Sequence, residues 1–165
     1  MKDHWGNVKR TFSTLAYLVK RMDPDGIEIR FTNARLSTKA RSKDRDGLLA
    51  LFESVLPKGR SDIALSLGTR ILRAYEPKPY KNPNKLSSLL RKPKWGVNVY
   101  VLTDGVWGEG DAWLDGVVEP IKYLLSKGMA LNEMGIQFIQ FGDDKEGTRR
   151  LTMLDNELTK HGVAK

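Results

Sequence analysis

Apolar positions at the amino end of the chain recur in steps of three and four residues. They are Trp5, Val8, Phe12, Leu15, Val19 and Met22. This spacing predicts an amphipathic helix. We expect it to end near Pro24, because proline disfavours helix at the preceding residue and Asp25-Gly26 favours a turn. The alternating residues 27–32 then predict a strand with one buried face, and a further strand is expected around residues 34–38.

The central part of the chain predicts two more helices. Apolar residues between positions 48 and 56 mark the first, which ends before Pro57. The second is expected to begin at Ser61, with the serine hydroxyl as its cap and Asp62 favourably placed on the helix dipole.

The last third of the chain predicts two strands and two helices. Residues 97–102 are nearly continuously apolar and β-branched, which indicates a strand covered on both faces, as in a parallel sheet. A helix over residues 114–125 follows, in which Pro120 either produces a kink or starts the main section. Residues 134–141 predict another strand, and leucines at 151, 154 and 158 a closing helix.

Helices that alternate with buried strands predict one α/β domain with a mainly parallel sheet flanked by helices. Binding sites in such sheets form beyond the carboxyl ends of the strands. Asp104 and Asp143 each follow a predicted strand at such an end. We therefore look for the chemistry of this protein there.

The positive charge of the chain is concentrated in one segment. The 165 residues include 28 Lys and Arg against 20 Asp and Glu, a net charge of +8, which favours acidic partners. Residues 76–95 carry four of the seven prolines and six basic residues against one acid, or +5. Such proline density predicts a long surface loop. Its basic side chains either keep the loop solvated or contact nucleic acid or an acidic protein; they are Lys78, Lys81, Lys85, Arg91, Lys92 and Lys94.

Most enzyme signatures are missing from the sequence. The chain has no cysteine, which excludes disulfides, thiolate metal sites and cysteine nucleophiles. It has neither a phosphate-binding loop nor a nucleophile elbow, and the glycines from Gly105 to Gly110 lack dinucleotide-loop spacing. His4 and His161 have no neighbouring serine or acid that would form a triad. We expect no enzymatic activity.

Asp104 and Ser61 are the most informative polar positions. Asp104 follows a buried strand and precedes a glycine, so its carboxylate either caps the following turn or offers a hard oxygen to Mg²⁺. Ser61 could supply a second oxygen at the same crevice. A hydrolase that uses a metal-bound water at Asp104 is the least favoured interpretation, because nothing supplies a nucleophile or a second metal.

Five stretches, in this order, resemble von Willebrand factor type A domains, most closely those of fungal intracellular multidomain proteins. They are Asp23-Pro24-Asp25-Gly26-Ile27, Pro57-Lys58-Gly59-Arg60-Ser61, Val99-Tyr100-Val101-Leu102-Thr103-Asp104-Gly105, Gly135-Ile136-Gln137-Phe138 and Phe141-Gly142-Asp143-Asp144. The resemblance covers residues 1–165 as a single domain and implies a Rossmann-like sheet. The loop at 76–95 is its main irregularity.

The resemblance also implies an incomplete metal-ion-dependent adhesion site. Asp104 matches the family's aspartate after the fourth strand, and Ser61 stands at its threonine position. The Asp-x-Ser-x-Ser element is not present. Mg²⁺ would then have two protein oxygens and several waters, which is a weak site, and no other cofactor is implied. In the family, an acidic side chain of a protein partner commonly completes the metal coordination.

The missing element has a consequence for the sheet. In the family it follows the first strand, which lies at the centre of the sheet and is lacking here. We therefore expect a fragment or truncated form of a longer protein, with two inward edges between residues 27–32 and 97–102. Each buried, unpaired backbone group there would cost about 1–3 kcal/mol. A complementing strand from a second molecule is the alternative.

The resulting hypothesis is a non-enzymatic protein–protein interaction module with a weak or absent Mg²⁺ site. The alternative is a basic nucleic-acid-binding domain that uses the loop at 76–95, near Tyr80 and Trp95. No apolar run approaches the roughly 20 residues of a membrane span, and the first residues lack a signal peptide's apolar segment. With the resemblance, this favours a cytoplasmic or otherwise intracellular protein.

Overall fold

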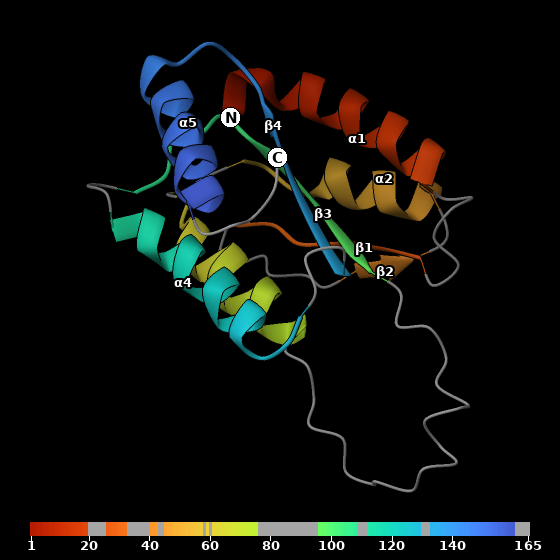
Figure 1. The fold of residues 1–165 in the computed structure, drawn as a ribbon. Coiled ribbons are helices and arrows are strands. Elements are labelled where there is room, and N and C mark those ends of the chain that lie inside the picture. Colours follow the sequence, from red (N-terminus) through yellow and green to blue (C-terminus); the bar gives the residue numbers. More distant parts are fainter. Residues whose placement is uncertain are drawn as a thin grey trace, which may run out of the picture.

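The computed structural model describes residues 1–19, 26–32, 40–42, 45–57, 59, 61–75, 96–108, 112–129 and 133–160. Both helices and strands occur along this part of the chain, and they alternate from β3 onward (Figure 1). In order they are η1 (Lys2–His4), α1 (Trp5–Val19), β1 (Ile27–Ile29), β2 (Ala40–Ser42), α2 (Arg45–Ser54), η3 (Ala64–Ile71), η4 (Leu72–Tyr75), β3 (Val97–Thr103), α4 (Ala112–Ser126), β4 (Met134–Gln140) and α5 (Lys145–Lys160). The chain is of the mixed α/β class, as the sequence predicts.

The described strands form two separate pairs. β3 and β4 are parallel, and their register runs from Val97 opposite Met134 to Thr103 opposite Gln140. β1 and β2 are antiparallel, with Ile27 opposite Ser42. The parallel pairing predicted for the two apolar strands is confirmed. However, the described strands do not form one continuous sheet, and the break falls between β1 and β3.

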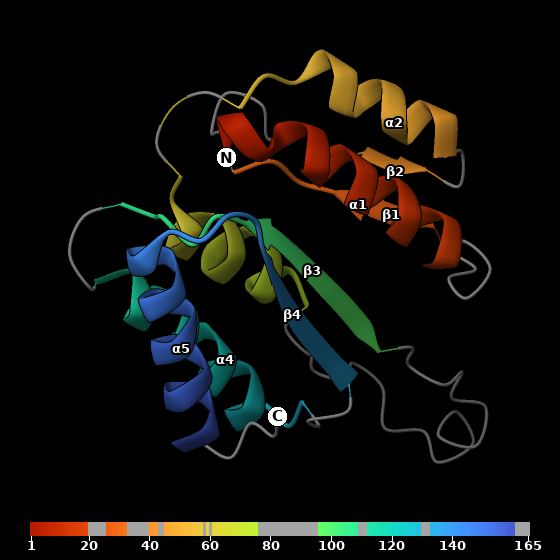
Figure 2. The same cartoon turned by 90° about the horizontal axis from the view of Figure 1, so that it is seen from above.

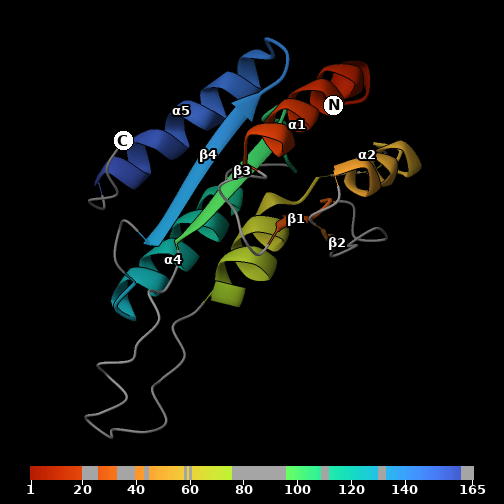
Figure 3. The same ribbon diagram turned by 90° about the vertical axis from the view of Figure 1, so that its right-hand side faces the viewer.

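The β3–β4 pair lies between two layers of helices (Figure 2). On one face, partly buried strand residues such as Val101 and Phe138 pack against a core formed with η3, α4 and α5. On the other face, Leu102 and Ile139 pack against the cluster that contains α1 and α2. Figure 3 shows the same order from the side, with α1 and α4 on opposite sides of β3.

η3 and α4 approach each other closely through small residues. A Cβ added at Gly116 would lie 2.2 Å from the Cβ of Ala64, and one added at Gly68 would lie 2.0 Å from the Gly116 carbonyl oxygen. The predicted helix after Ser61 is present, but it is wound as a π-helix, and the Leu72 N–H bonds to the Leu67 carbonyl. Pro120 lies inside α4.

Aromatic rings dominate the amino-terminal core. Phe52 of α2 stacks on Phe12 of α1, with ring centroids 4.4 Å apart, and on Trp5, at 5.4 Å. Phe31 meets Phe52 edge-on at 5.2 Å. β1 is shorter than the strand predicted at 27–32, and the strand expected around 34–38 lies outside the described residues. No described helix is both long and apolar enough to cross a membrane.

Candidate functional site

The carboxyl end of β3 is held by a buried threonine. Thr103 is 5% exposed, and its Oγ1 accepts hydrogen bonds from the Gly105 N–H, at 3.0 Å, and from the indole Nε1 of Trp107, at 2.9 Å. The chain then turns at Gly105, which adopts a φ of 80°, a conformation that costs glycine little energy. This anchors the loop of residues 104–108 above the sheet.

Asp104 uses its two carboxylate oxygens differently. Oδ1 accepts a hydrogen bond from the Val106 N–H at 3.2 Å, which caps the turn, as one of the two sequence interpretations expects. Oδ2 forms an ion pair with the α-ammonium group of Met1 at the start of η1. Both partners of this pair are partly buried. Asp104 therefore presents one carboxylate oxygen that already holds a cationic group.

The predicted capping role of Ser61 is wrong. The helical turns begin at Ile63, so Asp62 occupies the capping position, and its Oδ1 accepts a hydrogen bond from the Leu65 N–H at 2.8 Å. The Ser61 hydroxyl instead lies 3.3 Å from the Thr32 hydroxyl. Ser61 is thus not needed by the helix and remains available as an oxygen ligand.

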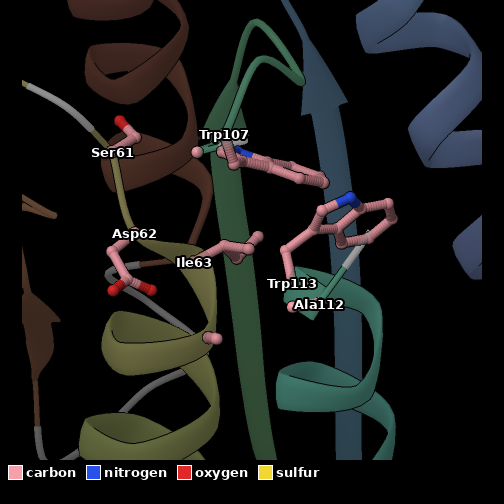
Figure 4. Close-up of a pocket in the computed structure, with 8 residues that line it drawn as sticks. Ser61, Asp62, Ile63, Trp107, Ala112 and Trp113 are labelled. Atoms are coloured by element: carbon pink, nitrogen blue, oxygen red, sulfur yellow. The ribbon is translucent and has the colours of Figure 1, made fainter. Parts of the chain in front are cut away.

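A cavity of about 450 Å³ brings the Ser61 segment and the loop after Asp104 together (Figure 4). It is lined by Ser61, Asp62, Ile63, Ala64, Trp107, Gly108, Ala112 and Trp113. Asp104 does not line this cavity, but the loop that it starts does, through Trp107 and Gly108, and Ser61 borders the same cavity. We call the lining of this cavity, together with Asp104, the rim.

Sequence reasoning missed the residues that hold the rim in place. Arg150 of α5 is only 6% exposed, and its guanidinium donates to the Trp107 carbonyl and, at 2.7 Å, to Glu146. It also lies 5.8 Å from the Trp113 ring centroid. The only signal in the sequence was the i, i+4 spacing of Glu146 and Arg150, which predicts a pair but not its burial.

The pKa of Glu146 is clearly shifted. Hydrogen bonds from Arg149, and then from Arg150, lower the pKa of its carboxyl from 4.5 to about 2. The carboxylate therefore stays ionised down to strongly acidic pH. It continues to orient Arg150 and, through that side chain, the backbone at Trp107.

The rim offers few ligands to a metal ion. Among the residues that the structure describes, no three His, Cys, Asp or Glu side chains gather in a group that could hold a metal. Asp104 offers one carboxylate, while Ser61 and Thr32 offer hydroxyls. Asp144, near the end of β4, caps α5 through the Gly147 N–H at 2.8 Å. This donor set fits a weakly held, largely hydrated Mg²⁺ at most.

The other predicted binding residues belong to a single segment of the chain. Lys78, Lys81, Lys85, Arg91, Lys92 and Lys94 all belong to the segment 76–95, which lies outside the described residues. Their proposed contact with nucleic acid or an acidic protein therefore remains a prediction from the sequence.

Comparisons with known proteins do not identify this site. The resemblance to von Willebrand factor type A domains remains a prediction from the five sequence stretches. No family model, curated protein or solved structure matches this chain.

Proposed function

We propose that this chain is a non-enzymatic protein-interaction module of the von Willebrand factor type A kind, with an incomplete metal-ion-dependent adhesion site. The observation that carries the proposal is the rim, where Ser61 and the loop that begins at Asp104 border one cavity. In an α/β sheet, the carboxyl ends of the strands are where ligands are expected.

The architecture of the chain supports this proposal. A parallel strand pair lies between two helical layers, as in Rossmann-like domains. The break between the two strand pairs falls where the resemblance lacks one strand. The finer assignment to this family is part of the proposal.

The chemistry of the rim suits an acidic side chain of a partner protein. Trp113 lines the cavity and is 6% exposed, and its buried indole Nε1 has no hydrogen-bond partner among the described residues. Mg²⁺ at Asp104 and Ser61, in place of the Met1 α-ammonium group on Asp104 Oδ2, would add positive charge beside the cavity. A carboxylate entering the cavity would then complete the coordination of the ion.

The metal part of the proposal is tested by thermal unfolding with Mg²⁺. For a site half-saturated at the Mg²⁺ concentration used, the stabilisation is about 0.4 kcal/mol. This corresponds to a rise in Tm of about 1–2 °C for a chain of this size. We expect no larger rise at millimolar Mg²⁺. A rise of many degrees that Asp104→Ala abolishes would reveal a strong site and contradict the incomplete one.

The binding part is tested with a short peptide that carries one central aspartate between apolar residues. We expect calorimetric binding that is stronger with Mg²⁺ than with a chelator, and that is lost with Asp104→Ala. The matched control is the same peptide with asparagine at the centre. Equal binding of both peptides would refute recognition of an acidic side chain at the rim.

Nucleic-acid binding is the alternative proposal, favoured by the net charge of +8 and by the basic segment 76–95. It requires an affinity for mixed DNA or RNA that falls steeply with salt. Replacing Lys78, Lys81 and Lys85 by Gln should then reduce the slope of log K against log salt by about 2–3. Salt-insensitive or undetectable binding would exclude this alternative.

A further inference from the structure

Neither β3 nor β1 has a second strand partner among the described residues, so each of these strands has one unpaired edge. β3 pairs with β4 alone, and β1 pairs with β2 alone. β1 and β3 also border the same apolar cluster, because Ile29 of β1 and Leu102 of β3 both pack with α1. β1 and β3 therefore both pack against the cluster that contains α1.

One hydrogen bond shows which residues of β3 direct their backbone N–H and C=O groups toward the open edge. The Phe141 N–H, just after β4, donates to the Thr103 carbonyl at 2.8 Å. Thr103 therefore directs its peptide groups toward β4, and since successive residues of a strand alternate between its two edges, Val99 and Val101 do the same. Asn98, Tyr100 and Leu102 direct theirs toward the open edge.

The chemistry of the β3 edge differs from that of β1. β3 contains no charged residue and no proline, although edge strands usually carry one or the other as protection against pairing. β1 carries Glu28, which pairs with Arg30 at 2.6 Å, and Arg30 also donates to the Arg70 carbonyl of η3 at 3.0 Å. Charged side chains thus protect β1 against pairing with a further strand, whereas β3 has no such protection.

The apolar residues of β3 are also incompletely covered. Its sequence is typical of a strand buried on both faces, yet Thr103 is its only fully buried residue, and Tyr100 is 37% exposed. The surroundings of β3 are apolar on both faces. Val99 and Val101 pack against one core, and Leu102 packs against the other. A strand beside β3 would meet aliphatic side chains above and below.

We propose that the open edge of β3 is a strand-accepting site, which binds an extended, uncharged, apolar segment of a partner polypeptide by β-augmentation. Main-chain hydrogen bonds to Asn98, Tyr100 and Leu102 supply affinity, and the aliphatic surroundings select the side chains. A partner is favoured over a second copy of this chain because two copies, each with a net charge of +8, repel one another.

Amide hydrogen exchange tests whether the edge is open. In the full chain, the amides of Asn98, Tyr100 and Leu102 should exchange quickly, whereas those of Val99, Val101 and Thr103 should be protected by β4. Equal protection of all six amides would overturn the proposal, because it would mean that the edge is already paired.

The binding test uses a fluorescently labelled peptide with the sequence of β4, Met134–Gln140, which is uncharged and is the strand that β3 already accepts. We expect saturable binding and new protection of the amides of Asn98, Tyr100 and Leu102. The control peptide carries Ile136→Pro and Ile139→Pro, which remove one N–H from each edge of the strand. Equal binding of this control would show apolar adsorption and overturn the proposal.

Variants of the full chain locate the binding. Tyr100→Glu places a charge on the open strand and should weaken peptide binding about tenfold or more. Tyr123→Glu is the matched control, because Tyr123 of α4 is 40% exposed, much as Tyr100 is, and should leave the affinity unchanged. Equal weakening by both variants would place the peptide elsewhere and overturn the proposal.

Two further outcomes separate this site from other occupants and from the rim. Dimerisation that the peptide does not compete with, and that Tyr100→Glu abolishes, would assign the edge to a second copy and overturn the choice of a partner segment. Peptide affinity should be the same with Mg²⁺ and with a chelator. This inference can therefore hold even where the proposed function at the rim fails.

Discussion

The two strand pairs are built by different means. β3 and β4 are seven-residue parallel strands whose side chains pack with aliphatic and indole groups of η3, α4 and α5. β1 and β2 pair over only three residues, and stacked rings of Trp5, Phe12 and Phe52 dominate the adjoining core. One region has a long hydrogen-bonded ladder, and the other depends mainly on side-chain packing.

This difference explains where the rim lies. Long strands fix the position at which the chain leaves the sheet, so the loop after β3 starts from a rigid point and is held by Thr103 and Arg150. The aromatic region contributes to the rim mainly through Met1, which binds Asp104, and through Thr32, which lies beside Ser61. α1 links the two regions, since Leu102 and Ile139 belong to its cluster.

The largest expected loss of stability comes from creating a cavity in one or the other hydrophobic core. Leu72 of η4 is 0% exposed in one core and Leu48 of α2 is 2% exposed in the other, so Leu72→Ala and Leu48→Ala should each lower the free energy of unfolding by about 2–5 kcal/mol. Denaturant unfolding measures this. Because α1 packs on β3 and β4, we expect hydrogen exchange to rise in both regions for either variant. A rise confined to residues 1–57 in Leu48→Ala would show that the two regions unfold separately.

A smaller effect should come from the contact between η3 and α4. Gly116→Ala places a methyl group 2.2 Å from the Ala64 Cβ, and the resulting overpacking should cost about 1–3 kcal/mol of unfolding free energy. Gly6→Ala in α1 is the control, because nothing lies within 4 Å of an added Cβ there. Alanine should stabilise that helix by about 0.5–1 kcal/mol. Equal destabilisation by both variants would contradict the close approach of η3 and α4.

The smallest effect concerns pH and Glu146. Its pKa is lowered from 4.5 to about 2 in the folded chain, so its stabilising contribution is present above the unfolded pKa and is lost as the pH falls through the folded one. Thermal unfolding should therefore show a decline in stability between about pH 4.5 and pH 2 that is shallower in Glu146→Gln. An unchanged slope in that variant would show that the pairs with Arg149 and Arg150 do not form in solution.

The sequence by itself determined the helices, the two long strands and the position of Asp104. Periodicity records which positions are buried, and a β-branched run that ends in Thr103-Asp104-Gly105 marks the end of a strand wherever the strand packs. The sequence did not determine which residue caps the helix that begins at Ile63. Ser61 and Asp62 are both good capping residues, and only the starting point of the helix distinguishes them.

Only the tertiary structure decided how the rim is held and how the strands divide. The bond from Arg150 to the Trp107 carbonyl joins residues 43 positions apart, and local pattern carries no record of such a contact. The π-helical winding of η3 and its approach to Gly116 likewise involve two elements at once. Periodicity gives the face that a segment buries, but packing in three dimensions decides which element covers that face. The same packing separates β1 from β3. One edge of each of these strands therefore has no strand partner among the described residues.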